Sequence, residues 1–188
     1  MNPPDLFELT VPVNATDHIL GAAHASVAVV EYGDFECPRC KAAAPAVKML
    51  LDDYASDVRF VFRHFPLEEA HPHALAAAEA AECAGEQGKF WEMSELLFAN
   101  QTHLQSKHLR DYADRLGLDM AQFTAEMDDH VYLQRIREQI DGGKRSRVRA
   151  TPGFFVNGTI QDVSYELQAL FDATEAAVRS SRGGARAR

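Results

Sequence analysis

"VVEYGDFECPRCKAAAP" (residues 29–45) places two cysteines three positions apart, directly after a β-branched run and directly before a helix-forming run. The run "ASVAVVEY" over 25–32 is typical of a strand that is buried on both faces. Cys37 therefore falls at a strand-to-helix junction, and Cys40 lies one turn inside the helix. Such a pair can bind a metal, cross-link the fold or exchange disulfides with another molecule.

A second strand is predicted over 58–65, "VRFVFRHF". Between the two strands Val47, Leu50, Leu51 and Tyr54 follow the i, i+3, i+4, i+7 spacing of one buried helix face. A strand, a helix and a strand over about forty residues form a βαβ unit with a parallel strand pair.

Helical periodicity replaces strand patterns from residue 67 to about 141. Pro72 marks a helix start, and Glu79, Glu82 and Glu86 then share one face while alanines fill the other, as in an amphipathic helix. The segment therefore predicts a helical block of roughly seventy residues.

Two further features complete the predicted fold. Asp119 has the sequence context of a helix N-cap, and Asn157-Gly158 is a strong hairpin signal. We therefore expect an α/β domain whose sheet is completed only after the chain returns from a helical insertion. The expected boundaries are 1–66 for the first part of the domain, 67–141 for the insertion, 142–179 for the second part and 180–188 for a disordered tail.

Composition and charge narrow the class of protein. The 188 residues carry a formal net charge of −9, so their surface would repel nucleic acid. No stretch reaches the 18 consecutive apolar residues of a membrane-spanning helix, and we expect no membrane partner. The first residues, "MNPPDLFELTVPVNATDH", lack the apolar core of a secretory signal, so the expected location is cytoplasmic.

The location bears on the cysteine pair, because cytosolic thiols are kept reduced unless a bridge is catalytic or sensing. A structural disulfide framework is therefore not expected. A zinc site needs four ligands, and the remaining candidates are His71 and His73, which flank a proline that would aim their rings differently. We therefore expect no metal and no cofactor, and we interpret His71 as a residue of the N-cap region of a helix and His73 as a surface residue of its first turn.

The pattern favours redox chemistry. A sulfur at a helix N-terminus meets unpaired N–H groups and the positive end of the macrodipole, which stabilise a thiolate. Such positions lower a cysteine pKa from about 8.5 to roughly 3.5–7.5. Cys37 is then the attacking thiol and Cys40 the resolving thiol, while Pro38 and the cationic Arg39 between them tune the couple.

Three motifs, "EYGDFECPRC", "HPHA" and "ATPGFFVNG", together resemble the DsbA-type branch of the thioredoxin-fold thiol-disulfide oxidoreductases, from about Asp17 to Val178. The resemblance implies a thioredoxin fold with an inserted α-helical domain, acting on protein or small-molecule substrates that contain thiols or disulfides. Glutathione and thioredoxin are the candidate electron partners. The net direction of exchange is left open.

The resemblance also implies roles for three residues outside the pair. The Thr151–Pro152 bond would be cis in a loop beside Cys37, with the Thr151 backbone free to pair with an extended client; an ordinary trans proline at a strand start is the alternative. Glu31 matches a buried acid that relays protons to the resolving cysteine, with Arg63 as a candidate counter-ion. A solvent-facing strand end is the alternative for Glu31.

Two other functional classes stay open. Kappa-type glutathione transferases and 2-hydroxychromene-2-carboxylate isomerases also place helices inside a thioredoxin domain, but they generally use a single serine. The second class is a non-catalytic module that senses redox state or binds zinc. Cys83, at the border of two helix faces, is interpreted as a packing residue, with a regulatory thiol as the alternative.

Overall fold

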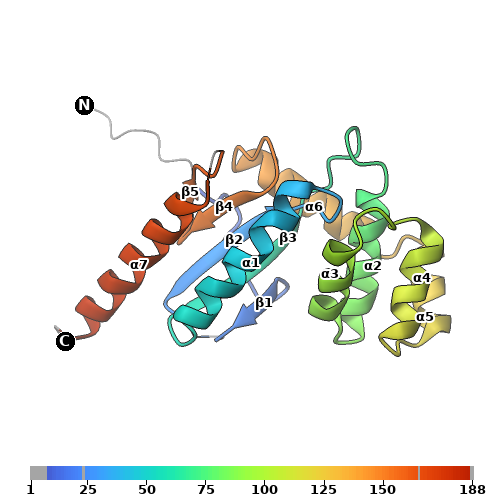
Figure 1. Ribbon diagram of the computed structural model, residues 1–188, viewed down its shortest axis with the longest axis horizontal. Coiled ribbons are helices and arrows are strands. Elements are labelled where there is room, and N and C mark those ends of the chain that lie inside the picture. The colour runs from blue at the N-terminus through green and yellow to red at the C-terminus, as the bar shows by residue number, and fades with distance from the viewer. Residues whose placement is uncertain (1–7, 23, 165, 187–188) are drawn as a thin grey trace. The chain divides into compact units, whose positions relative to one another are not determined.

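The computed structural model describes residues 8–22, 24–164 and 166–186, and its strands form a five-stranded mixed sheet (Figure 1). The strand order is β1-β3-β2-β4-β5. β1 pairs with β3, β2 with β4, and β4 with β5, all antiparallel, so β2 and β3 supply the parallel pair of the mixed sheet. The strands are β1 (His18–Gly21), β2 (Val27–Gly33), β3 (Val58–His64), β4 (Gly153–Val156) and β5 (Thr159–Gln161).

The central strands are apolar on both sides, as the sequence predicted. Val27, Val29 and Val30 of β2 are at most 1% exposed, which fits a strand with neighbours and cover on both faces. The hairpin between β4 and β5 turns at Asn157-Gly158, whose φ angles of 47° and 88° are those of a tight hairpin turn. Both predictions are confirmed.

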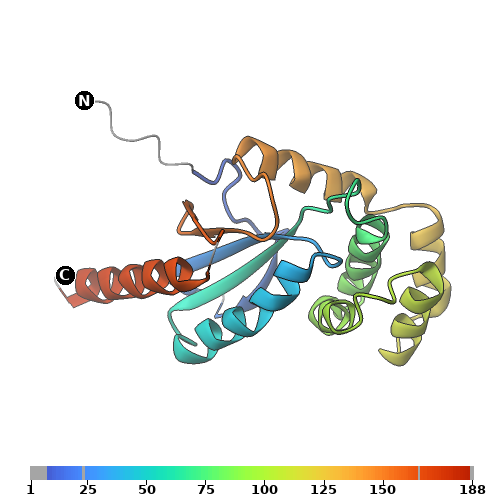
Figure 2. The same cartoon turned by 45° about the horizontal axis from the view of Figure 1, so that its top comes forward.

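Two helices accompany the sheet. Helix α1 (Pro38–Asp53) connects β2 to β3 and buries Val47 and Leu50, two residues of the predicted stripe. Helix α7 (Gln168–Arg186) contacts β4 and β5, beside which it lies in Figure 2.

Helix α7 continues through residues 180–186, where the sequence predicted a disordered tail; residues 187–188 lie outside the described part. Two contacts account for the difference. The Arg182 guanidinium pairs with the Asp57 carboxylate at 2.7 Å, and the Ser26 hydroxyl donates to the Ser181 hydroxyl at 2.9 Å. These partners lie more than a hundred positions away in the chain, so local sequence does not indicate them.

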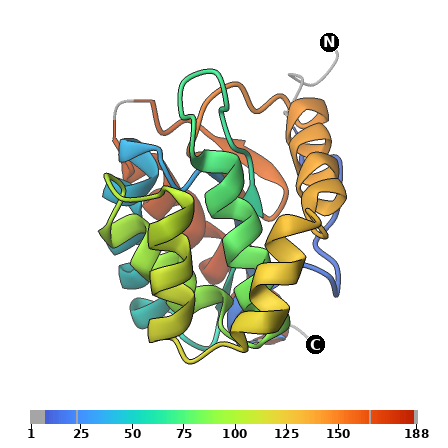
Figure 3. The same cartoon turned by 90° about the vertical axis from the view of Figure 1, so that its right-hand side faces the viewer.

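The predicted helical block consists of α2 to α5 and most of α6, and α2 contacts α3, α4 and α5 (Figure 3). Their bounds are α2 (Ala74–Glu86), α3 (Phe90–Ala99), α4 (Ser106–Arg115), α5 (Met120–Asp128) and α6 (Leu133–Arg145). In the parts of the chain that the structure describes, none of the helices combines the length and apolar character needed to cross a bilayer.

Helix α2 differs from the amphipathic helix expected. Its neighbours bury it on most sides, so Glu79 and Glu82 are only 3% and 1% exposed, while Glu86 near its end is exposed. Each buried carboxylate has a histidine or arginine partner. His130 Nδ1 lies 2.9 Å from Glu79, and Glu82 binds His64 and Arg135. An acidic helix face is thus internal here because distant side chains neutralise it.

The chain divides by packing into two compact units. The sheet unit consists of residues 1–32, 43–63 and 142–188, and the helical unit consists of residues 33–42 and 64–141. The segment 33–42, which carries both cysteines of the pair, therefore packs with the helical block. The boundaries expected from the sequence differ here, because they grouped that segment with the sheet.

Candidate functional site

Cys37 lies immediately before the first residue of α1. Its N–H donates to the Asp34 carbonyl at 3.1 Å, and its own carbonyl accepts the Lys41 N–H at 3.2 Å. Cys40 is the third residue of the helix. The two residues are 5% and 1% exposed. The more accessible sulfur is thus at the helix start, where a thiolate is favoured.

The backbone before Cys37 is held by the loop that follows α3. The Gln101 side-chain amide donates to the carbonyl oxygens of Phe35 and Cys37, at 2.9 and 2.8 Å. On the next turn, Lys41 Nζ donates to the Ala99 carbonyl at 3.3 Å. The end of α3 and the loop that follows it therefore fix the path of the chain into α1.

Asp34 anchors the same segment on a second loop. Its carboxylate accepts the backbone N–H of Glu36 at 2.8 Å, the N–H of Leu67 at 2.9 Å and Nδ1 of His71 at 2.7 Å. The Asp34 side chain is fully buried, and that of His71 is 18% exposed. Three donors compensate the buried carboxylate, which keeps the segment in one position.

A second acidic side chain makes a parallel contact two residues later. Glu36 accepts the backbone N–H of His73 at 2.7 Å and its Nδ1 at 3.1 Å. We call Asp34, Glu36, His71 and His73 the histidine–carboxylate clamp. His73 is the N-cap position of α2, without a side-chain cap bond, and its side chain is 35% exposed, whereas the sequence predicted a surface residue of the first turn. His71 lies two positions earlier, in the cap region where it was expected.

The clamp sets the charge state of one histidine. Burial alone would lower the pKa of His71, but its hydrogen bond to Asp34 and the charges of Asp34, Cys37 and Glu36 raise that pKa above the ordinary 6.5. A negative charge on Cys37 is thus one of the charges that favour the protonated imidazole. Among the described residues, no group of three or more His, Cys, Asp or Glu side chains is arranged to hold a metal.

Phe35 forms the apolar side of the segment. Its ring is 1% exposed, with its centroid 5.7 Å from that of His64 and 5.0 Å from that of Phe98. His64 Nε2 in turn lies 2.9 Å from the Glu82 carboxylate, which also lies 3.3 Å from Nε of Arg135. The residue two positions before Cys37 is thus packed against a buried ionic network.

Pro38 and Arg39, the two residues between the cysteines, are both exposed. Their exposure leaves the face of α1 that carries them accessible to a partner. The tuning role expected of Pro38 and Arg39 stays a prediction.

The other residues predicted for the site belong to the sheet unit. Glu31 lies in β2, 3% exposed, opposite Phe154 of β4. The Thr151–Pro152 peptide bond is cis, and both residues are buried directly before β4. Glu31 and this loop are therefore carried by adjacent strands.

Arg63 of β3, the expected counter-ion of Glu31, is bound by another acid. Its Nε and Nη2 donate to the two carboxylate oxygens of Asp17, each at 2.8 Å, and its Nη1 donates to the Tyr32 hydroxyl at 3.1 Å. A counter-ion role toward Glu31 stays a prediction.

Sequence reasoning missed Asp34, Glu36 and Gln101. The positions of Asp34 and Glu36, within three residues of Cys37, were a signal for these two. A carboxylate beside a thiolate is unfavourable unless other groups form hydrogen bonds with it. Gln101 lies in a loop sixty-four positions after Cys37, and nothing in its local sequence marks it.

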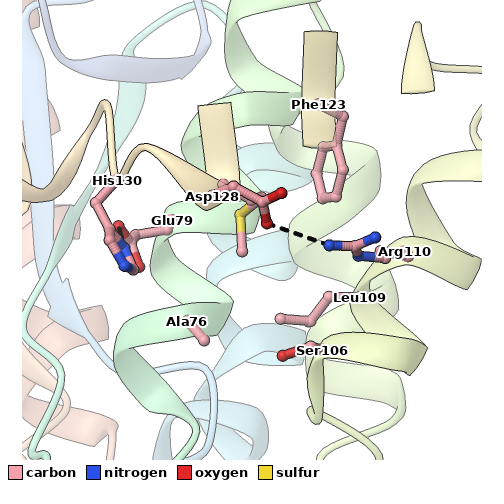
Figure 4. A pocket seen from close by; sticks show the side chains of 9 residues that line it. Ala76, Glu79, Ser106, Leu109, Arg110, Phe123, Asp128 and His130 are labelled. Atoms are coloured by element: carbon pink, nitrogen blue, oxygen red, sulfur yellow. Dashed lines mark hydrogen bonds and ion pairs between the residues drawn. The ribbon is translucent and has the colours of Figure 1, made fainter. Parts of the chain in front are cut away.

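A separate hollow of about 390 Å³ lies within the helical unit (Figure 4). Its apolar lining includes Leu109 and Phe123, and its charged groups pair with each other, Arg110 with Asp128 at 3.2 Å and His130 with Glu79. Because these charges are matched within the hollow, it indicates no ligand class by itself.

A family model and several curated proteins match this chain. The family model described as "Thioredoxin" matches residues 13–173. Among curated proteins, "Na(+)/H(+) antiporter NhaA 1" of Salinispora arenicola is 48% identical over 97% of this chain and 28% of its own length. A Mycobacterium sp. protein of the same name is 39% identical over 94% of this chain and 30% of its own length. The chain thus spans less than a third of these relatives.

Solved structures show the same fold. BdbD from Bacillus subtilis has a TM-score of 0.78 at 23% identity, covering 86% of this chain and 92% of its own. A thioredoxin-like oxidoreductase from Silicibacter pomeroyi has a TM-score of 0.78 at 26% identity, covering 88% and 94%. Wolbachia pipientis alpha-DsbA1 has a TM-score of 0.76 at 20% identity, covering 95% and 98%. With a helical block between β3 and β4 and a cysteine pair at the start of α1, the chain belongs to the thioredoxin family and has its DsbA-like form.

Proposed function

We propose that the protein is a thiol-disulfide oxidoreductase that exchanges disulfides with protein or small-molecule thiols through Cys37 and Cys40. The observation that carries the proposal is the position of the pair: Cys37 lies at the start of α1, and Cys40 lies one turn later. The helix start favours a thiolate on the first sulfur and leaves the second as a less exposed thiol.

The exchange follows from these positions. In the reducing direction the Cys37 thiolate attacks a client disulfide, forms a mixed disulfide and releases one client thiolate. The Cys40 thiolate then attacks the Cys37 sulfur, closes the Cys37–Cys40 disulfide and releases the second client thiolate. The client gains two electrons and the pair loses two, and the oxidising direction is the reverse.

The supporting residues have proposed roles of their own. Pro38 shapes the first turn of α1, and Arg39 adds a positive charge beside the thiolate. Glu31 takes the proton of Cys40 as that thiol becomes a nucleophile. The Thr151–Pro152 loop offers its backbone to an extended client segment.

The direction of exchange depends on the reduction potential and on the compartment. Cytoplasmic location stays a prediction, which cell fractionation checks. A potential above the cytosolic glutathione poise of about −220 to −320 mV would indicate an oxidant or isomerase, and one near −270 mV a reductase. Glutathione or thioredoxin would then be the electron partner.

Serine variants of the two cysteines test the proposal. Cys37→Ser should abolish dithiol-dependent reduction of insulin, because the nucleophile is lost. Cys40→Ser should accumulate mixed disulfides with clients, because the intermediate can no longer resolve. Retained activity in Cys37→Ser would overturn the assignment of the nucleophile.

The same experiment separates the alternatives. A kappa-type transferase would conjugate glutathione to an electrophile and tolerate loss of Cys40. A zinc module would purify with stoichiometric metal and lose it in either variant. The cysteine pair and the DsbA-like neighbours favour disulfide exchange over both.

The relatives suggest a second, contextual role. They are named Na+/H+ antiporters, and this chain matches less than a third of each. We propose an antiporter as one client or neighbour of this domain, in place of the expectation that it has no membrane partner. An antiporter polypeptide recovered in the Cys40→Ser mixed disulfides would support this role, and a set of adducts without one would contradict it.

A further inference from the structure

The histidine–carboxylate clamp contains one imidazole whose geometry fixes where it can take up a proton. Asp34 is fully buried and accepts from His71 Nδ1 at 2.7 Å. A carboxylate only accepts hydrogen bonds, so Nδ1 carries the hydrogen and Nε2 is the nitrogen that gains or loses a proton. The Leu67 and Glu36 N–H groups hold the carboxylate in place, so it cannot turn away when the imidazole changes charge.

The segment that enters α1 adds a third negative charge when Cys37 is a thiolate. Asp34, Glu36 and Cys37 all lie on the segment that enters α1; Asp34 binds His71 Nδ1 at 2.7 Å, and the Asp34 carbonyl accepts the Cys37 N–H at 3.1 Å. Negative charge on each of the three favours the protonated imidazole. Glu68 and Glu69 are exposed on the turn that precedes the histidine. Of these groups, Cys37 is the one that changes charge when a disulfide opens or closes.

We propose that His71 is a positioning residue for the Cys37–Cys40 couple, taking up a proton at Nε2 when the disulfide is reduced so that its positive charge balances the Cys37 thiolate. The inference rests on the proposed function, since it requires Cys37 and Cys40 to be a redox pair. Arg39 also carries positive charge, but a guanidinium keeps it at every physiological pH. Of these two residues, only His71 can change its charge near neutral pH and so make the redox equilibrium of the Cys37–Cys40 couple depend on pH.

The reaction balances with glutathione as the reductant. Two glutathione thiols give up two electrons and two protons and become glutathione disulfide. The electrons break the Cys37–Cys40 bond. One proton goes to the Cys40 sulfur and the other to His71 Nε2, while Cys37 remains a thiolate.

The direct test is a nuclear magnetic resonance titration of the histidine rings in the oxidised and reduced wild-type protein. His71 should bind its proton more tightly in the reduced form, by roughly tenfold for a nearby unit charge. His73, on the same loop and paired with Glu36, is the internal control and should shift less. Equal proton affinity of His71 in both forms would overturn the inference.

Matched variants provide a second readout. His71→Asn and His73→Asn each keep a side-chain N–H donor toward the partner carboxylate. If His71 takes up a proton on reduction, the equilibrium constant with glutathione changes with pH near neutrality in the wild-type protein. This change should be absent in His71→Asn and present in His73→Asn. An unchanged pH dependence in His71→Asn contradicts the inference and leaves the proposed function standing. Failure of the wild-type pair to form a disulfide at all contradicts both.

Discussion

Burial makes the Cys83 thiol less reactive than a cysteine at a helix start. It lies in α2 with none of its surface exposed. Burial, together with the neighbouring Glu126, raises the pKa of the Cys83 thiol from 9.0 to about 12. A thiol with so little thiolate is a poor nucleophile, so the interpretation of Cys83 as a packing residue is confirmed and a regulatory role is disfavoured.

Iodoacetamide at pH 8 should therefore leave Cys83 unmodified in the folded protein and label it in urea. Peptide mass spectrometry measures the labelling, and the denatured sample is the matched control. Rapid labelling of Cys83 in native buffer would contradict its burial.

The same shift gives stability a pH dependence. Because the folded pKa of about 12 exceeds the unfolded value of 9.0, the contribution of the neutral thiol is complete below about pH 9 and lost as pH rises toward 12. The stability advantage of wild type over Cys83→Ala should shrink by about 2 kcal/mol from pH 8 to pH 10.5. Urea unfolding of both proteins at the two pH values measures it, and a constant difference would contradict the shift.

Glu82 is the second residue whose environment decides its contribution. It is 1% exposed and bound by His64 and Arg135, so removing its carboxylate leaves cationic groups without their partner. Glu82→Ala should lower the free energy of unfolding by about 3–5 kcal/mol. Glu86→Ala, an exposed site one turn later on α2, should change it by less than about 0.5 kcal/mol. Similar losses in the two variants would contradict the buried network.

At the scale of elements, local signals predicted the ends of helices and strands well. Asp119 caps α5 as expected, accepting the N–H groups of Ala121 and Gln122 at 2.9 and 3.0 Å. Asn157-Gly158 forms the expected hairpin. Caps and tight turns depend on a few adjacent residues, which is why sequence specifies them.

The α5 cap gives a prediction of its own. Asp119→Ala removes the acceptor for two backbone N–H groups and should destabilise the protein by about 1 kcal/mol, whereas Asp119→Asn keeps an acceptor oxygen and should cost less. Thermal unfolding of the two variants beside wild type measures the difference. Equal melting temperatures for wild type and Asp119→Ala would show that the cap contributes nothing.

Helix burial was predicted less well than helix ends. The pattern of Glu79, Glu82 and Glu86 suggested one polar face, yet the first two are buried against helices and loops that lie far away in the chain. Burial depends on which elements meet, and a charged face becomes internal when distant cations neutralise it. Those partners cannot be predicted from the sequence of the helix alone.

For the whole molecule, the sequence predicted the thioredoxin fold with its helical insertion, because strand, helix and hairpin signals occur in a distinctive order. It also located the cysteine pair at the start of a helix, which needs only the strand-to-helix boundary. It did not predict that residues 33–42 pack with the helical block. That grouping depends on Asp34, Glu36 and Gln101, whose partners are up to sixty-six positions away.

A redox titration of the wild-type protein in glutathione buffers shows whether Cys37 and Cys40 form one reversible disulfide. Alkylation of the remaining thiols, read by peptide mass spectrometry, follows each cysteine separately. Cys37 and Cys40 should lose their thiols together in one two-electron transition, while Cys83 keeps its thiol throughout. Cys37 and Cys40 that stay free at every glutathione ratio, or that oxidise independently of each other, would contradict it.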